Sequence, residues 1–90
     1  MKKKEVRNQQ EFDACVAENN IAVVIGCKIV ARENSKVVER ENSTVEAWGN
    51  TFIRFFSCLK ITASEGVVIL KHNQSDSIAG GRQLDIIKTQ

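Results

Sequence analysis

Few side chains in this sequence could carry out chemistry, and their spacing limits what each can do. His72 is the sole histidine, and no serine or cysteine stands at a spacing that indicates a catalytic triad with it. The cysteines, Cys15, Cys27 and Cys58, are odd in number and widely spaced, which fits neither a disulfide framework nor a zinc site. We therefore expect no catalytic residue, metal or cofactor, and we interpret the cysteines as small core residues.

Charged residues suggest two further kinds of site. Basic residues recur in the first half of the chain, at Lys2, Lys3, Lys4, Arg7, Lys28, Arg32, Lys36 and Arg40. Such a strip can bind phosphates, but glutamates interrupt it, so we interpret it as a solvated face. A carbohydrate-active enzyme needs clustered carboxylates, and only Glu41 and Glu65 would stack at one corner of a coil. We interpret that pair as ordinary surface charge.

Aromatic residues between positions 48 and 56 form the most informative local feature. In the strand pattern described below, Phe52 and Phe56 point outward with Arg54 between them, and Trp48 points outward beside the same corner. An exposed cluster of Trp, Phe and Arg has the composition of an interaction hot spot. The candidate partner-binding residues are Trp48, Phe52, Arg54, Phe56, Val68 and Leu70. The alternative is that a loop or the N-terminal helix covers them.

These side chains would be positioned by an eight-residue repeat. Consecutive octads between positions 18 and 73 each carry Ile or Val at their fourth place: Ile21, Ile29, Val37, Val45, Ile53, Ile61 and Ile69. A period of eight is not helical, and a β-branched column indicates strands. Places two, four and six share one parity and should point inward, so places three, five and seven point outward. Glu39 and Lys71 are inward exceptions, which we expect to reach solvent near corners.

Asparagine and glycine at the octad boundaries predict corners, because both accept left-handed backbone angles at low cost. A strand and corner repeated in this way must coil into a solenoid to bury its inward face. We favour three octads per coil, which places Val45 between Ile21 and Ile69 and stacks Val68 and Leu70 beside Trp48. A flattened coil of two octads remains open.

Both ends of the chain have features of caps. Asn8 and Glu11 form a capping-box pattern, which predicts a short helix over 9–18 that covers the first coil. Near the other end Gly80-Gly81 predicts a turn, and Leu84, with the isoleucines at 86 and 87, predicts a closing strand. We expect one domain over 1–90, with an N-terminal cap over 1–17, the solenoid over 18–73 and a C-terminal cap over 74–90.

Composition agrees with a soluble domain. Hydrophobic residues make up 42%, charged residues 27%, and the formal net charge is +2. No apolar run follows the leading lysines as in a signal peptide, and no run is long enough to span a membrane. We therefore expect a cytoplasmic protein without membrane or nucleic-acid binding.

The octad Asn42-Ser-Thr-Val-Glu-Ala-Trp-Gly49 resembles the degenerate Asn-Ser-Thr-Val-x-Ala-x-Gly octads of bacterial and phage β-solenoid proteins, which are mostly uncharacterised. The resemblance extends to the N-terminal segment and to the Ser-Ile-Ala-Gly-Gly run at 77–81. It implies a right-handed β-helix and a bacterial or mobile-element origin, and it supplies no catalytic residues.

The sequence thus predicts an all-β, single-stranded β-solenoid (a right-handed β-helix) of about three coils with a short N-terminal capping helix. We expect a non-enzymatic protein that binds another protein or itself as a homo-oligomer, for example a phage-encoded inhibitor of a host protein. The alternative is a carbohydrate-active or nucleic-acid-binding β-helix module.

Overall fold

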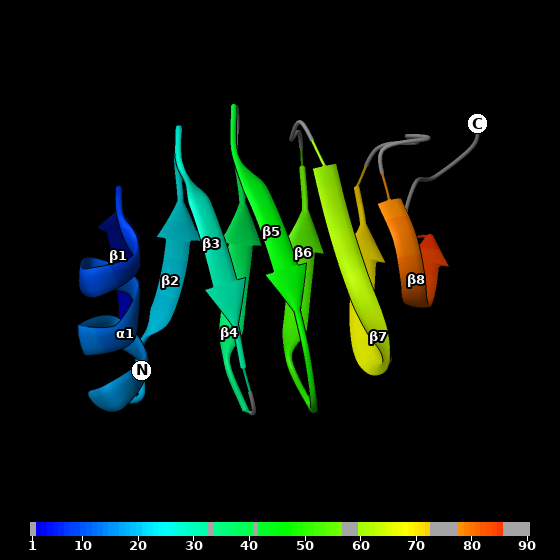
Figure 1. Cartoon of the computed structure of the whole chain (residues 1–90), viewed down its shortest axis with the longest axis horizontal. Helices are drawn as coiled ribbons and strands as arrows, with labels where there is room; N and C mark the ends of the chain where they lie inside the picture. Colours follow the sequence, from blue (N-terminus) through cyan, green and yellow to red (C-terminus); the bar gives the residue numbers. More distant parts are fainter. Residues whose placement is uncertain (1, 33, 41, 57–59, 73–77, 86–90) are drawn as a thin grey trace.

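The computed structural model describes residues 2–32, 34–40, 42–56, 60–72 and 78–85, which are mostly strands with one short helix. The elements in chain order are β1 (Lys3–Val6), α1 (Gln9–Ala17), β2 (Ile21–Val24), β3 (Lys28–Ala31), β4 (Lys36–Glu39), β5 (Thr44–Ala47), β6 (Phe52–Phe55), β7 (Lys60–Lys71) and β8 (Ile78–Asp85). All strand pairs in the described chain are parallel, in a curled, solenoid-like sheet (Figure 1).

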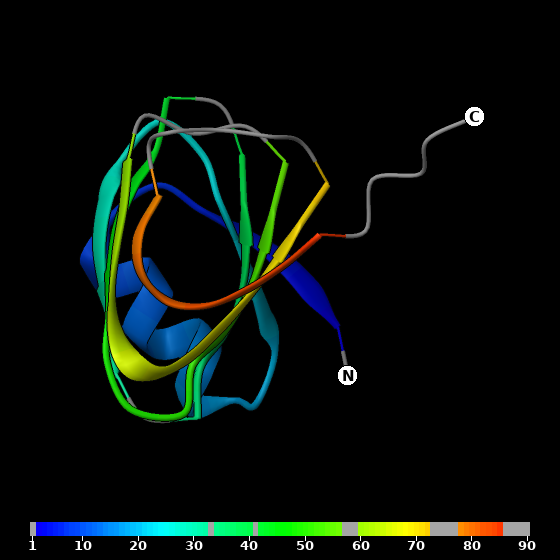
Figure 2. The same ribbon diagram turned by 90° about the vertical axis from the view of Figure 1, so that its right-hand side faces the viewer.

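Alternate strands pair, so the chain builds two ladders. The first ladder contains β1, β2, β4, β6 and the second half of β7. The second ladder contains β3, β5 and the first half of β7, and β8 pairs with both halves of β7. The two ladders run in opposite directions, one behind the other (Figure 1), and the end-on view in Figure 2 shows the strands curling around a common interior.

The register fixes the number of octads per turn. Lys36 lies opposite Phe52, and Lys28 lies opposite Thr44, sixteen residues along the chain in each case. Two octads therefore make one turn, and the expected coil of three octads is wrong. Small inward side chains explain the difference, because Ala31 and Ala47 are fully buried on the second ladder and let the ladders approach closely.

The inward column of β-branched residues forms the core from its second member onward. The fully buried apolar residues of the strands and corners include Ile29, Val37, Val45, Ile53, Phe55, Ile61, Val67 and Ile69. The prediction for the first member, Ile21, is wrong. Ile21 is half-buried, and Ala22 and Val24 point inward instead. Ala22, not Ile21, lies opposite Val37, so this turn spans fifteen residues, one fewer than the sixteen that separate Val37 from Ile53 and Ile53 from Ile69.

Asparagine corners are confirmed at two octad boundaries, where Asn34 and Asn42 have φ of 61° and 56°. The octad boundary at Gly66 is not a corner, because β7 continues through it. Glycine is needed there for space, since a Cβ on Gly66 would lie 2.8 Å from the Gly49 carbonyl oxygen. Buried corner hydroxyls add local hydrogen bonds. The Ser35 hydroxyl donates to the Arg32 carbonyl at 2.5 Å, which satisfies polar groups that the corner buries.

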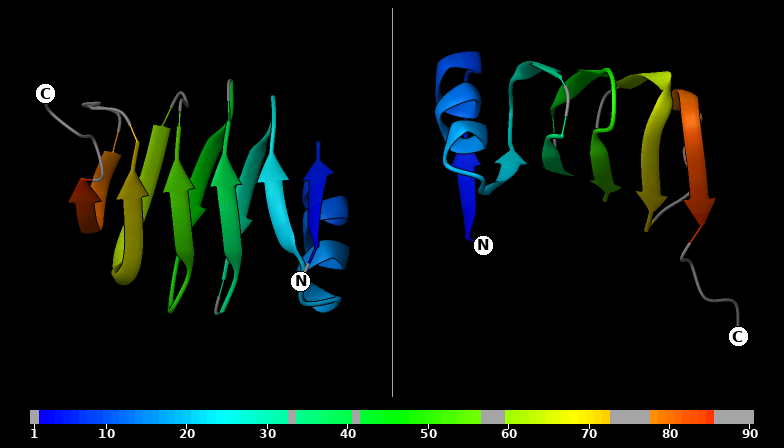
Figure 3. Two further views of the ribbon diagram at one scale, coloured as in Figure 1. Left: turned by 180° about the vertical axis from the view of Figure 1, so that it is seen from behind. Right: turned by 90° about the horizontal axis from the view of Figure 1, so that it is seen from below.

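The predicted N-terminal helix is confirmed as α1, with the Asn8 side chain accepting a hydrogen bond from the Glu11 amide at 2.8 Å. Its Phe12 and Cys15 are buried in the core. The sequence did not predict β1, whose register places Lys3 opposite Ile21 on the first ladder. Helix and strand together cover the N-terminal end of both ladders (Figure 3).

The predicted turn at Gly80-Gly81 is wrong, since both glycines lie inside β8. There the strand passes from one ladder to the other: Ile78 pairs with Ile61, and Leu84 pairs with Leu70. Positive φ angles of 82° and 70° at the two glycines allow this bend without ending the strand. Residues 86 and 87 of the predicted closing strand lie outside the described residues.

Candidate protein-binding face

The outward side of the first ladder brings together most of the predicted partner-binding residues. Parallel pairing places Phe52 opposite Val68 and Arg54 opposite Leu70. Val38, from the preceding turn, lies opposite Arg54 on its other side. We call this surface the Phe52 face and define it by the outward side chains of Val38, Phe52, Arg54, Phe56, Val68 and Leu70.

The Phe52 face is apolar and open to solvent at its edges. Phe52 is 38% exposed, whereas Val38, surrounded by longer side chains, is only 5% exposed. Leu84 lies opposite Leu70 and is 47% exposed, so it extends the face along β8. The helix α1 packs against β1, β2 and β3 at the end of the ladders and leaves Phe52 uncovered. A sheet face with this composition is typical of an interaction surface.

A stacked cluster holds one side of the face in place. The His72 ring stacks on Phe56 with centroids 4.0 Å apart and planes at 13°. Arg40 and Arg54 each place a guanidinium 5.5 Å from the centre of the same phenyl ring. Arg54 Nε also donates to His72 Nε2 at 3.2 Å. The cluster therefore presents two arginines on a rigid aromatic support.

The Arg54 contact determines the state of the histidine. A guanidinium can only donate, so His72 Nε2 must carry the lone pair and Nδ1 the proton. Burial lowers the pKa of His72, and the positive charge of Arg54 lowers it further. His72 is thus a neutral acceptor that orients Arg54.

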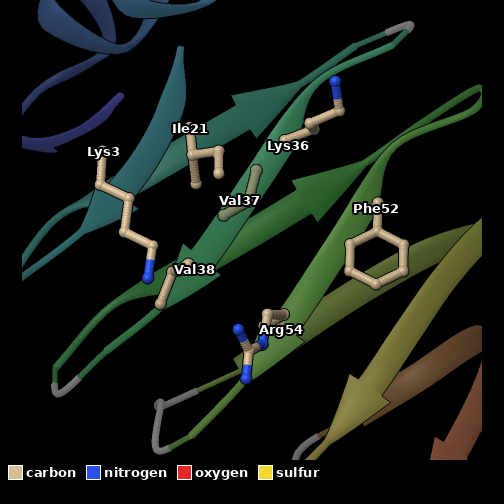
Figure 4. Close-up of a pocket in the computed structure, with 7 residues that line it drawn as sticks. All are labelled: Lys3, Ile21, Lys36, Val37, Val38, Phe52 and Arg54. Carbon is tan, nitrogen blue, oxygen red and sulfur yellow. The ribbon is translucent and has the colours of Figure 1, made fainter. Parts of the chain in front are cut away.

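A groove of about 370 Å³ opens at the β1 end of the face (Figure 4). Its lining residues are Lys3, Ile21, Lys36, Val37, Val38, Phe52 and Arg54. The walls are almost entirely apolar, because the lysines contribute their aliphatic stems. In Figure 4 the Lys3 and Arg54 side chains extend toward Val38 from opposite sides, and the Lys36 amino group points away from it.

Trp48 lies on the other ladder. Its backbone amide donates to the Ala31 carbonyl at 2.9 Å, so it continues β5, and its indole donates to Glu46 at 3.1 Å. The expected stacking of Val68 and Leu70 beside Trp48 is wrong, because it assumed three octads per coil. Trp48 is 48% exposed, but it points out from the second ladder.

The other sequence candidates do not form a site. The basic strip is divided, with Lys28 on the second ladder and Lys36 on the first. Of the two corner glutamates, Glu65 is exposed on β7, and residue 41 lies outside the described residues. In the part of the chain that the structure describes, no group of three or more His, Cys, Asp or Glu could hold a metal ion, and no helix is long and apolar enough to cross a membrane.

Glu39 corrects another expectation, because it does not reach solvent. It is fully buried, and the Ser43 hydroxyl donates to its Oε1 at 2.6 Å. No described group hydrogen-bonds its Oε2. Burial raises the pKa of Glu39 to about 8, an effect that the Ser43 hydrogen bond opposes. A carboxyl group sealed in this way is closed to any substrate.

The thiols lie in or beside the core, as predicted for two of the three. Cys15 is buried and Cys27 is half-buried, and burial raises the pKa of both thiols. Both sites therefore favour the unreactive protonated form. Residue 58 lies outside the described residues.

The site predicted from the sequence did not include some residues of the Phe52 face and its groove. Among them are Lys3 and Ile21, which line the groove, and Leu84, which lies opposite Leu70. The octad pattern assigns Ile21 to the core, and the charged run of β1 has no pattern typical of a strand. Leu84 joins the face through the pairing of β8, which no periodicity indicates.

Comparisons of the chain with protein families, curated proteins and solved structures find no match.

Proposed function

We propose that this protein binds another protein through the Phe52 face and that its role is recognition, not catalysis. The observation that carries the proposal is an exposed phenylalanine, Phe52, on a sheet face where its neighbours are Val68 and Arg54. Aromatic residues and arginine dominate the binding energy of protein interfaces. Parallel pairing holds their backbones rigid, so little ordering is needed when a partner binds.

Charge favours a different protein over a second copy of this chain. Lys36 and Arg82 are exposed in the row that contains Phe52 and Val68, one on each side of that pair, and Arg40 and Arg54 flank Phe56. A two-fold dimer would place this basic surface against itself, and like charges across an interface cost free energy. A partner with acidic groups meets the same surface with favourable electrostatics.

We also propose that the fold is a right-handed β-solenoid with sixteen residues per turn. Parallel strands joined by a crossover in one sheet are right-handed in nearly all cases. The direction in which the strands wind from N to C in Figure 1 supports this hand. An experimental structure would test the hand and the number of turns together.

The proposal is tested by affinity capture from cell extract followed by titration of the purified partner. Phe52→Ala combined with Leu84→Ala removes two exposed apolar side chains from the face and its extension, so the fold should be retained. We expect the double variant to bind the captured protein at least about tenfold more weakly. Trp48→Ala is the matched control, because it removes an exposed aromatic from the other ladder.

Retention of the same protein by the double variant would contradict the proposal, as would an equal loss of binding in Trp48→Ala. Light scattering of the purified protein addresses self-association. We expect a monomer, and a dimer that Phe52→Ala dissociates would show that the face binds a second copy.

A further inference from the structure

The groove beside Phe52 combines an apolar floor with a basic surround. Val38 lies at its base and is almost completely covered, while Ile21 and Phe52 belong to opposite walls (Figure 4). A volume of about 370 Å³ is at the small end of the range for ligand pockets. The space therefore suits a side chain and its neighbours in an extended segment, and is too small for a whole domain.

The charges around the groove have one sign. Its lining contains three cations, Lys3, Lys36 and Arg54, and no carboxylate in the described part of the chain. Glu5, the acidic residue nearest to Lys3 in sequence, does not line the groove and forms an ion pair with Arg7 at 3.2 Å. Lys3 and Lys36 are both exposed, so a ligand can reach their ammonium groups without displacing a buried partner.

Arg54 connects the groove with the rest of the face. His72 and the Phe56 ring fix its guanidinium, which reduces the conformational entropy that Arg54 would lose on pairing with a carboxylate. Nε and Nη2 both face His72 Nε2, so a carboxylate would pair with the remaining Nη donors, and their fixed plane suits it better than a mobile lysine does.

From this geometry we propose that the groove binds an acidic segment of the partner protein that inserts one large apolar side chain against Val38 while its carboxylates pair with Lys3, Lys36 and Arg54. This inference rests on the proposed function and specifies the chemistry of the partner. The apolar side chain supplies burial of non-polar area, and the charges supply orientation and a faster association rate.

The probe is a display library of short random peptides, selected against the wild-type protein. We expect the enriched peptides to combine aspartate or glutamate with a large apolar residue. Synthetic copies of these peptides, labelled with a fluorophore, are then titrated by fluorescence polarisation. Binding should weaken as salt is raised, because the lysine contacts are exposed to solvent.

The decisive variant is Lys3→Glu combined with Lys36→Glu, which reverses two charges at the groove. Its matched control is Lys28→Glu with Lys60→Glu, which makes the same change in net charge at exposed positions of the second ladder. We expect the groove variant to weaken peptide binding by at least about tenfold and the control to change it less than about twofold.

Three results would overturn the inference: no peptide is enriched, the enriched peptides lack acidic residues, or both charge-reversal variants weaken binding equally. The captured partner separates this inference from the proposed function. If Phe52→Ala with Leu84→Ala abolishes its binding and Lys3→Glu with Lys36→Glu does not, the Phe52 face is correct and the acidic segment is wrong. If neither double variant affects the partner, both proposals fail.

Discussion

Glu39 makes the stability of this protein depend on pH in an unusual direction. Its side chain is fully buried, and its pKa is raised from 4.5 to about 8. The unfolded chain releases this proton as pH rises above about 4.5, and the folded chain holds it until about pH 8. The contribution of Glu39 to stability is therefore complete below pH 4.5 and is lost between pH 4.5 and 8.

We expect Glu39→Gln to remove this loss, because an uncharged isostere titrates in neither state. Near pH 8 the variant should be more stable than the wild type, by an amount on the order of a few kcal/mol. At pH 4.5 it should be equal or slightly less stable, because its amide N–H groups need partners inside the core. Urea denaturation followed by circular dichroism between pH 4.5 and 8 measures the difference.

Glu65→Gln provides the control for this experiment, since Glu65 is exposed on β7. It makes the same chemical change at a surface position, so the loss of stability that we assign to Glu39 should persist in this variant. A wild-type protein that becomes more stable from pH 5 to 8, in parallel with Glu39→Gln, would contradict the assignment.

His72 offers a second test at the scale of single residues. Because it is the sole histidine, its C2 proton resonance can be assigned without ambiguity. We expect the titration midpoint of His72, which is its pKa, to lie below pH 6.5, since burial and the charge of Arg54 both favour the neutral ring. As pH falls below 6.5 through this lower pKa, the ring gains a proton and can no longer accept from Arg54, so its contribution to stability is lost.

Arg54→Gln should raise the His72 midpoint part of the way toward 6.5, because it removes the charge and leaves the burial. Proton NMR titration measures both values. Arg82→Gln is the control, as it removes an exposed arginine further along the same ladder. An unchanged midpoint in Arg54→Gln would show that the Arg54 contact does not perturb His72.

The N-terminal cap shows how a single side chain can terminate a ladder. Gln9 Nε2 donates to the Val30 carbonyl at 2.9 Å, and Gln9 Oε1 accepts from the Val30 amide at 2.8 Å. These two bonds satisfy backbone groups at the edge of β3, where the described sheet order ends. An edge strand left open can pair with another chain. The Gln9 side chain thus makes hydrogen bonds to Val30 of the kind that a neighbouring strand would make.

Gln9→Ala should lower the free energy of unfolding by about 1–2 kcal/mol, because both Val30 groups lose their partner while alanine favours the helix slightly. Denaturant unfolding measures this effect, and Gln10→Ala, at the exposed neighbouring helical position, should change stability by less than about 0.5 kcal/mol. Equal effects of the two substitutions would mean that the Gln9 contacts do not stabilise the cap.

The sequence predicted elements well where a local rule acts and poorly where pairing decides. Asn8 and Glu11 identify the helix start, and Asn34 and Asn42 identify corners, because each depends on a residue's own backbone preference. β1 forms only through its pairing with β2, so its charged sequence gives no signal. The Gly80-Gly81 bend lies within a strand, although the same pair in isolation favours a turn.

At the scale of the whole molecule, periodicity predicts a solenoid but does not fix its circumference. Every octad carries the same inward column, so two octads per turn and three leave each side chain equally inward. The choice depends on how large an interior the side chains can fill, and small residues such as Ala31 and Ala47 favour the flatter coil. This is why Val68 and Leu70 were predicted beside Trp48, whereas the sixteen-residue register pairs them with Phe52 and Arg54 and leaves Trp48 on the other ladder.

The register makes a prediction that separates the two circumferences. Deleting Lys36–Thr51 removes one turn of sixteen residues, joins Ser35 to Phe52, and lets β6 pair with β2 and β7 with β3 in the original register. We expect this variant to fold cooperatively with a lower Tm, because a solenoid's stability is approximately the sum of its turns and their interfaces.

Deleting Thr44–Thr51, only half as many residues, should do more damage. It moves β6 onto the second ladder, where the inward Phe55 takes the place of Ala47 opposite Ala31. The inward and outward parity is kept, but a phenyl ring in an alanine position overfills the interior. Circular dichroism and amide NMR spectra compare the two variants. A folded eight-residue deletion beside an unfolded sixteen-residue deletion would contradict a turn of two octads. Removing a whole turn would then be more damaging than moving strands from one ladder to the other.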